Sequence, residues 1–127
     1  MSDQRSNHKA NSMKNLLSSF LISTFVMLTA QAQIIKTSLT LTVRDELGNT
    51  VKDASVKLFE NEADYIVEKN FSAEGTTDEK GVVKFKDLKA IPYFVLASKG
   101  DKDNVGAGEK TGKLSEKKFN KATIIIQ

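Results

Sequence analysis

The feature that most constrains this chain is an alternation of apolar and polar residues between positions 39 and 59. Apolar side chains occupy every second position from 39 to 43 and again from 54 to 58. A period of two is typical of a β-strand with one buried face. The turn-forming pair Gly48 and Asn49 separates the two runs. The pattern therefore predicts two strands joined by a turn, and their apolar faces need a second sheet to cover them.

Similar signals recur along the rest of the chain. Alternation predicts a strand around 83–85, the apolar run 93–97 predicts another, and the β-branched segment 122–127 predicts the closing strand. The segment 61–69 could be helical, but three adjacent apolar residues at 65–67 favour a strand that ends near position 71. We therefore predict an all-β fold, a single antiparallel immunoglobulin-like or transthyretin-like sandwich of about seven strands. Its predicted core comprises Leu41, Val43, Val56, Leu58, Phe85, Tyr93 and Val95.

The first 32 residues have the pattern of a secretory signal peptide. A basic start at Lys14 precedes the apolar run 16–29 and a small-residue exit that ends at Ala32. The run is too short for a spanning helix, which needs about 20 residues. We expect cleavage after Ala32, so that 33–127 forms one exported domain, periplasmic, secreted or at the cell surface. Residues 1–12 add only a polar head, which makes Met13 an alternative start.

Removing this leader changes the charge balance. The whole chain has 19 basic and 16 acidic residues, of which three basic and one acidic precede position 33. The predicted domain is thus almost neutral, and its charge gives no reason to expect a nucleic-acid partner. We expect no transmembrane segment in it either. The chain has no cysteine, so apolar packing has to stabilise the domain without disulfides.

Residue types argue against an enzyme. The one histidine, His8, lies in the leader, so the predicted domain lacks histidine-based triads, cysteine nucleophiles and the usual zinc ligands. We expect no catalytic residue, no metal and no cofactor. The segment from Asp101 to Asn104 begins like a calcium loop, but Val105 and Gly112 stand where ligand oxygens are needed. A flexible turn is the simpler interpretation.

Several segments together resemble a known family. They are LTLTV at 39–43, GNTVKDASVKL at 48–58, TDEKGVVKFKDL at 77–88 and PYFVLA at 92–97. Their arrangement is similar to the carboxypeptidase regulatory-like domain, a transthyretin-like sandwich. The resemblance implies a fold rather than an activity, since in the family this module often accompanies a catalytic domain or a transport receptor. The leader resembles those of exported proteins from Bacteroidota-type bacteria.

The resemblance raises one covalent possibility. Adhesin repeats of a related fold can join a lysine to an asparagine beside a buried acid. Lys36 and Asn120 would be the candidates by position. No acid is clearly placed in the apolar interior, so an ordinary exposed lysine is the expected state.

The segment 99–121 is the strongest candidate for a functional surface. Its 23 residues lack a clean period and carry seven lysines against four acidic residues. Unstructured connections longer than about 12–15 residues are usually functional or disordered. A solvated loop is one interpretation. The other is a basic contact surface for an anionic glycan, a lipid headgroup or a protein patch, formed by Lys113, Lys117, Lys118 and Lys121.

The sequence therefore predicts a non-enzymatic, exported β-sandwich that acts as a binding or structural module at the cell envelope. The expected partner is an envelope protein or an anionic glycan or surface. The alternative is an accessory subunit of a separately encoded envelope transporter or enzyme, with no activity of its own.

Overall fold

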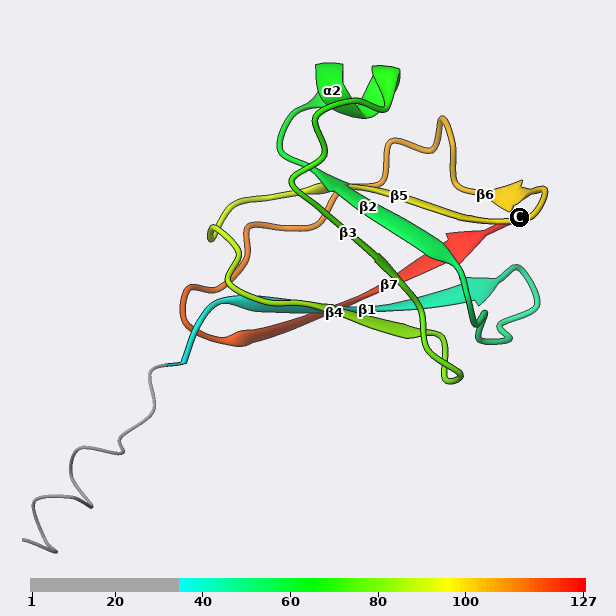
Figure 1. Cartoon of the computed structure of the whole chain (residues 1–127), viewed down its shortest axis with the longest axis horizontal. Helices are drawn as coiled ribbons and strands as arrows, with labels where there is room; N and C mark the ends of the chain where they lie inside the picture. Colours follow the sequence, from blue (N-terminus) through cyan, green and yellow to red (C-terminus); the bar gives the residue numbers. More distant parts are fainter. Residues whose placement is uncertain (1–34) are drawn as a thin grey trace, which may run out of the picture. The chain divides into compact units, whose positions relative to one another are not determined.

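The computed structural model describes residues 35–127, in which two packed sheets and one short helix form a β-sandwich (Figure 1). One sheet has the order β4-β1-β7, from β1 (Ser38–Asp45), β4 (Val82–Phe85) and β7 (Phe119–Ile126). The other has the order β3-β2-β5-β6, from β2 (Ser55–Phe59), β3 (Ala73–Thr76), β5 (Phe94–Lys99) and β6 (Lys102–Asp103). These two sheets confirm the predicted all-β sandwich. The predicted signal peptide, residues 1–32, lies outside the described residues.

The strands pair as expected with one exception. Four pairs, β1–β4, β2–β3, β2–β5 and β5–β6, are antiparallel. The last strand, β7, runs parallel to β1, in a register that extends from Ser38 opposite Phe119 to Asp45 opposite Ile126. Before it, residues 104–118 carry the chain from one sheet to the other, so the closing strand enters its sheet in the same direction as β1.

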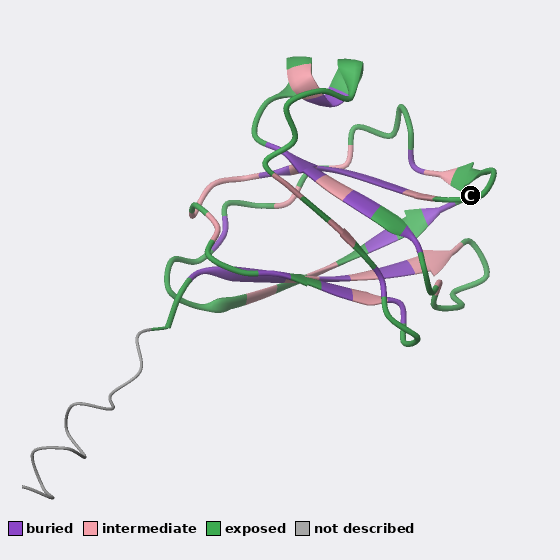
Figure 2. Ribbon diagram, viewed as in Figure 1, coloured by how far each residue is buried: buried purple, intermediate pink, exposed green. Residues whose placement is uncertain are grey.

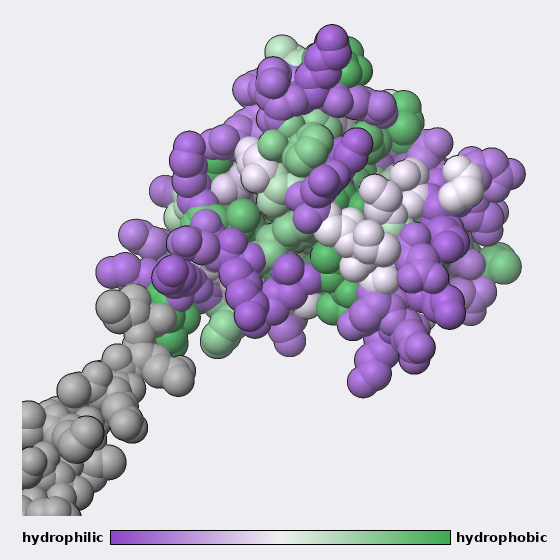
Figure 3. Space-filling model, in the orientation of Figure 1, coloured by the Kyte–Doolittle hydropathy of each residue, from purple (hydrophilic) through white to green (hydrophobic). Residues whose placement is uncertain are grey.

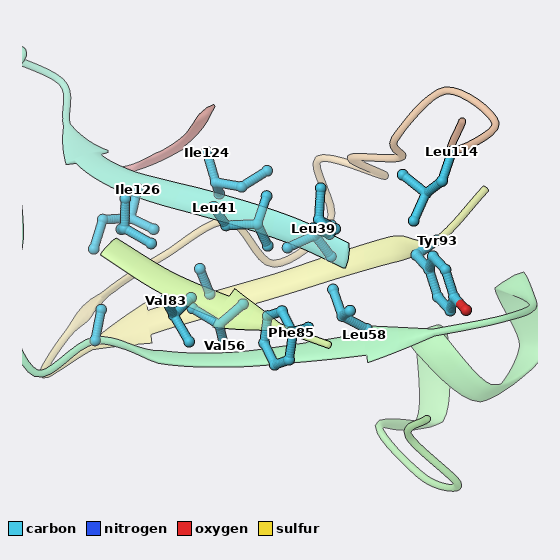
Figure 4. Close-up of a cluster of buried hydrophobic side chains, with 14 residues drawn as sticks. Leu39, Leu41, Val56, Leu58, Val83, Phe85, Tyr93, Leu114, Ile124 and Ile126 are labelled. Atoms are coloured by element: carbon cyan, nitrogen blue, oxygen red, sulfur yellow. The ribbon is translucent and has the colours of Figure 1, made fainter. Parts of the chain in front are cut away.

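The core lies between the two sheets, and all seven predicted core residues are buried (Figure 2). Side chains of β1, β4 and β7 meet those of β2 in the close-up of Figure 4, with Tyr93 and Leu114 at one end of the cluster. On the side of the molecule seen in Figure 3, hydrophilic residues cover most of the surface, and apolar residues show mainly in a band across the middle. No helix within residues 35–127 is long and apolar enough to span a membrane.

The strand predicted from position 65 is wrong. The segment forms a helix instead, α2 (Glu62–Val67). Asn61 caps its first turn, because its side-chain oxygen accepts a hydrogen bond from the backbone N–H of Asp64 at 2.9 Å. Tyr65 is the buried residue of the helix, and it packs edge-on against Phe59 and stacks on Phe94. Of the three adjacent apolar residues, only Tyr65 therefore covers the outer face of β2 and β5, whereas Ile66 and Val67 are exposed.

The third strand lies just beyond position 71, where the predicted strand was expected to end. β3 runs over Ala73–Thr76 and includes Gly75. A Cβ atom at this glycine would lie only 2.7 Å from Cγ2 of Val83 and 3.3 Å from Cε1 of Phe85. The backbone of β3 thus approaches the core side chains of β4 so closely that the strand has no room for an alternating apolar residue. Because glycine occupies this inward position, β3 lacks the alternation of apolar and polar residues from which a strand is predicted.

Candidate functional site

The four lysines that we predicted as a contact surface are all exposed, but the structure does not gather them in one place. Lys113 and Lys121 line the same groove. Lys117 and Lys118 lie in the turn that precedes β7, outside the lining of that groove. The structure therefore divides the predicted set into a groove pair and a turn pair.

Hydrogen bonds to β5 order the first part of the lysine-rich segment. The backbone N–H of Val95 donates to the carbonyl of Glu109 at 3.0 Å, and that of Thr111 donates to the carbonyl of Tyr93 at 2.8 Å. Residues 109–111 thus run alongside β5 as a short extension of its sheet. Burial raises the pKa of the Glu109 carboxyl, so this acid is less readily ionised than an exposed glutamate.

Asn104 attaches the start of the same segment to the sheet. Its side chain is buried, its Oδ1 accepts from the backbone N–H of Ala97 at 2.8 Å, and its Nδ2 donates to the carbonyl of Val95 at 2.9 Å. The amide oxygen that the calcium-like pattern offered as a ligand is therefore engaged in the fold. Within residues 35–127 no group of three or more acidic or histidine side chains is placed to hold a metal ion.

The second half of the segment is attached through Asn120 and Leu114. Asn120 donates to the carbonyls of Ser38 and Ser115 at 3.0 and 3.1 Å, and Leu114 is buried in the core. Lys36, the other residue of the considered crosslink, pairs instead with Asp87 at 3.6 Å. No acidic side chain is buried among the described residues, so the contacts of Lys36 and Asn120 give no support to an isopeptide bond.

A groove of about 290 Å³ opens between β7 and residues 110–114. Apolar residues of its lining come from β1, β7 and the connecting segment, and lysines and neutral polar residues complete it. The lining contains no acidic residue and comprises Leu39, Lys110, Thr111, Gly112, Lys113, Leu114, Asn120, Lys121 and Ala122. The charged residues of this lining are thus all lysines.

The three lysines of the groove are not equivalent. The ammonium of Lys110 lies 5.2 Å from the centre of the Phe94 ring, on the outer face of β5. Neither Lys113 nor Lys121 forms an ion pair within the described part of the chain. The ammonium groups of these two lysines are therefore available to pair with an anionic partner.

The solvent face of the β4-β1-β7 sheet extends the positive charge away from the groove. Thr40 lies opposite both Lys84 and Lys121, so the two lysines flank it on this face. The ammonium of Lys84 lies 4.9 Å from the centre of the Phe119 ring. The sequence did not indicate that Lys84 belongs to this basic surface. Alternation shows that the side chain of Lys84 points outward, but it does not show which strand lies next to β4. The outward positions of this sheet carry no acid; apart from the buried Ser38 they are Thr40, Thr42, Arg44, Val82, Lys84, Phe119, Lys121, Thr123 and Ile125.

A second groove, of about 220 Å³, lies on the outer face of the other sheet beside α2. Its lining mixes both signs of charge, since it includes Lys57 together with Glu68 and Asp103. Such a mixture attracts no particular class of charged ligand. The groove along β7 is therefore the better candidate.

No family model matches this sequence, and neither does any curated protein. A variant of BcpA, the major pilin subunit of Bacillus cereus, has a similar structure with 25% identity and a TM-score of 0.50, over 72% of this chain and 30% of the pilin. The group B streptococcus pilus 2b backbone protein has 14% identity and a TM-score of 0.51, over 72% of this chain and 40% of that protein. This chain matches less than half the length of either. It shares the β-sandwich fold with domains of these two pilus proteins.

Proposed function

We propose that this chain is an exported, non-enzymatic β-sandwich module that binds or builds structure at the cell envelope, and that it contacts an anionic partner through Lys113 and Lys121. The observation that carries the proposal is the groove along β7, whose lining contains three lysines and no acidic residue. The BcpA variant, similar at 25% identity, is a major pilin subunit, which supports a structural or surface role.

The charge distribution favours an electrostatic contact of modest strength. Lys113 and Lys121 are exposed, so salt screens their attraction over a Debye length of about 8–10 Å. Such charges increase the rate at which an anionic partner arrives more than they increase its final affinity. The apolar lining adds little further burial, because Leu39 and Leu114 are already buried in the core, so the contact depends mainly on charge.

Neutralising the groove pair tests the proposal. The double variant Lys113→Gln/Lys121→Gln is expected to lose retention on anionic matrices and envelope fractions, most strongly at low salt. Because both side chains are exposed, the free energy of unfolding should change by no more than about 0.5 kcal/mol per site. Retention is measured by salt elution, and stability by urea unfolding.

A matched variant separates the groove from total charge. Lys52 and Lys80 are exposed turn residues that do not line the groove, so Lys52→Gln/Lys80→Gln removes the same charge elsewhere. It should retain most of the binding. Lys117→Gln/Lys118→Gln should have an intermediate effect. Equal losses in all three double variants would mean that only net charge matters and that the groove is not a site.

Export and family are further parts of the proposal. We propose that the chain is processed after Ala32 and that it is a carboxypeptidase regulatory-like module of a Bacteroidota-type bacterium. N-terminal sequencing of the protein from its native host is expected to read from Gln33. An intact segment 16–30 in the mature protein would contradict processing. If a partner co-purifies from envelope extract in a one-to-one ratio, the accessory-subunit alternative is favoured.

A further inference from the structure

β7 is an edge strand whose pairing direction can be followed residue by residue. It pairs only with β1 among the described strands. The carbonyl of Lys118, just before the strand, accepts from the backbone N–H of Ser38 on β1 at 3.1 Å. Since peptide groups of successive strand residues point in opposite directions, the even-numbered residues of β7 point toward β1. The odd-numbered residues therefore present their N–H and C=O groups on the opposite side.

On the side of β7 that faces away from β1, only the C-terminal end of the strand is hydrogen-bonded. The N–H and C=O of Gln127 bond to the backbone of Asp103, at 3.1 and 3.3 Å. Within residues 35–127, the peptide groups of Lys121, Thr123 and Ile125 have no hydrogen-bond partner. A row of unpaired donors and acceptors of this kind is a template for another strand. The open part of the edge adjoins the lysine groove, and Lys121 belongs to both.

We propose that this edge accepts an extended acidic polypeptide segment as an added strand. The inference rests on the proposed function and names the class of partner. Regularly spaced donors and acceptors match another peptide backbone, whereas a glycan or a lipid headgroup has no such repeat. The borders of the groove carry lysines and no acid, so the segment is acidic.

The geometry also specifies how the side chains of the partner alternate. One row of the added strand would point inward beside Ala122 and over the apolar lining formed by Leu39 and Leu114. The other row would lie on the solvent face, next to Lys121 and Ile125. A carboxylate directly across from Lys121 makes a favourable cross-strand pair. The best ligand therefore alternates apolar and acidic residues.

A synthetic peptide provides the direct test. The probe is a ten-residue peptide of alternating valine and glutamate, blocked at both ends, added to the purified exported protein. Binding is followed by fluorescence anisotropy. We expect saturable binding and slower hydrogen exchange at the amides of Lys121, Thr123 and Ile125. The same peptide N-methylated at every residue keeps its charge but has no N–H donor on either edge, so it should bind at least about tenfold more weakly.

A backbone substitution tests the same contact from the side of the protein. Thr123→Pro removes an N–H that points away from β1 and places a proline ring in the path of an incoming strand. The affinity of this variant for the unmodified peptide should therefore fall at least about tenfold. Thr123→Val keeps the N–H and should bind within about twofold of the original protein. If Thr123→Pro does not fold, the N-methylated peptide still decides the question on the unchanged protein.

The outcomes separate this inference from the proposed function. Equal binding of the N-methylated peptide would overturn strand pairing and leave the charged groove in place. Lysine-dependent binding of phosphatidylglycerol vesicles or alginate, without binding of the peptide, would also overturn the inference while the proposed function stands. If Lys113→Gln/Lys121→Gln binds every probe as the original protein does, both are overturned.

Discussion

Replacement of Phe85 with alanine is expected to lower the free energy of unfolding by about 3–5 kcal/mol, the range for a buried aromatic residue. Only 6% of Phe85 is exposed, and it lies in the cluster between the two sheets (Figure 4). Its ring edge packs over Gly75, where β3 and β4 approach one another. Removal of the ring would leave a cavity at a place where the glycine backbone offers no side chain to fill it.

The loss is large because a domain of this size has about 5–15 kcal/mol of stability in total. Urea unfolding followed by circular dichroism measures it. The matched control is Phe119→Ala, because 65% of Phe119 is exposed on the solvent face of β7, and this substitution should cost no more than about 1 kcal/mol. Similar unfolding midpoints for the two variants would show that the assigned inward face of β4 is wrong.

Alternation of apolar and polar residues correctly predicted the strands whose apolar residues all face the core. Leu41 and Val43 on β1 and Val56 and Leu58 on β2 are all buried, as their shared phase predicts. The helix α2 was missed because tertiary packing overrode a local signal. In this helix the aromatic ring of Tyr65 covers the outer face of the second sheet, a role that adjacent apolar residues do not reveal.

The candidate site was only partly predictable, since it depends on register. The lysine-rich segment was identified from its composition, but composition gave no reason to group Lys113 with Lys121 rather than with Lys117. That grouping depends on residues 110–114 running beside β7, and β7 takes its place by pairing with β1, about 80 positions earlier in the chain. The open edge was likewise hidden, because it follows from which strand lies last in the sheet.

Asn104 shows a different limit of sequence reasoning. In the sequence it stands in a turn-like run of polar residues, where an exposed asparagine would be ordinary. In the structure only 5% of it is exposed, and its amide pairs with the backbone of β5 as a neighbouring strand would. The calcium-like pattern thus singled out Asn104 as a metal ligand, whereas its role in the structure is to bond the backbone of β5.

Asn104→Ala is therefore expected to lower the free energy of unfolding by about 2–4 kcal/mol, second only to Phe85→Ala among the variants proposed. The substitution leaves the N–H of Ala97 and the carbonyl of Val95 without the side-chain amide that bonds them. The matched control is Asn49→Ala, since Asn49 is exposed and its amide makes only a long 3.5 Å contact with Asp45. Urea unfolding should show a change below about 0.5 kcal/mol for this control.

Hydrogen exchange adds a local test of the same substitution. Asn104 joins the start of the 104–118 connection to β5, and the bonds of Val95 and Thr111 continue that attachment toward the groove. Loss of the first bonds should therefore speed exchange at Val95 and Thr111 beyond what global destabilisation explains, because local opening then costs less than unfolding. If exchange at these amides follows only the global change, Asn104 stabilises the sandwich without holding the groove in place.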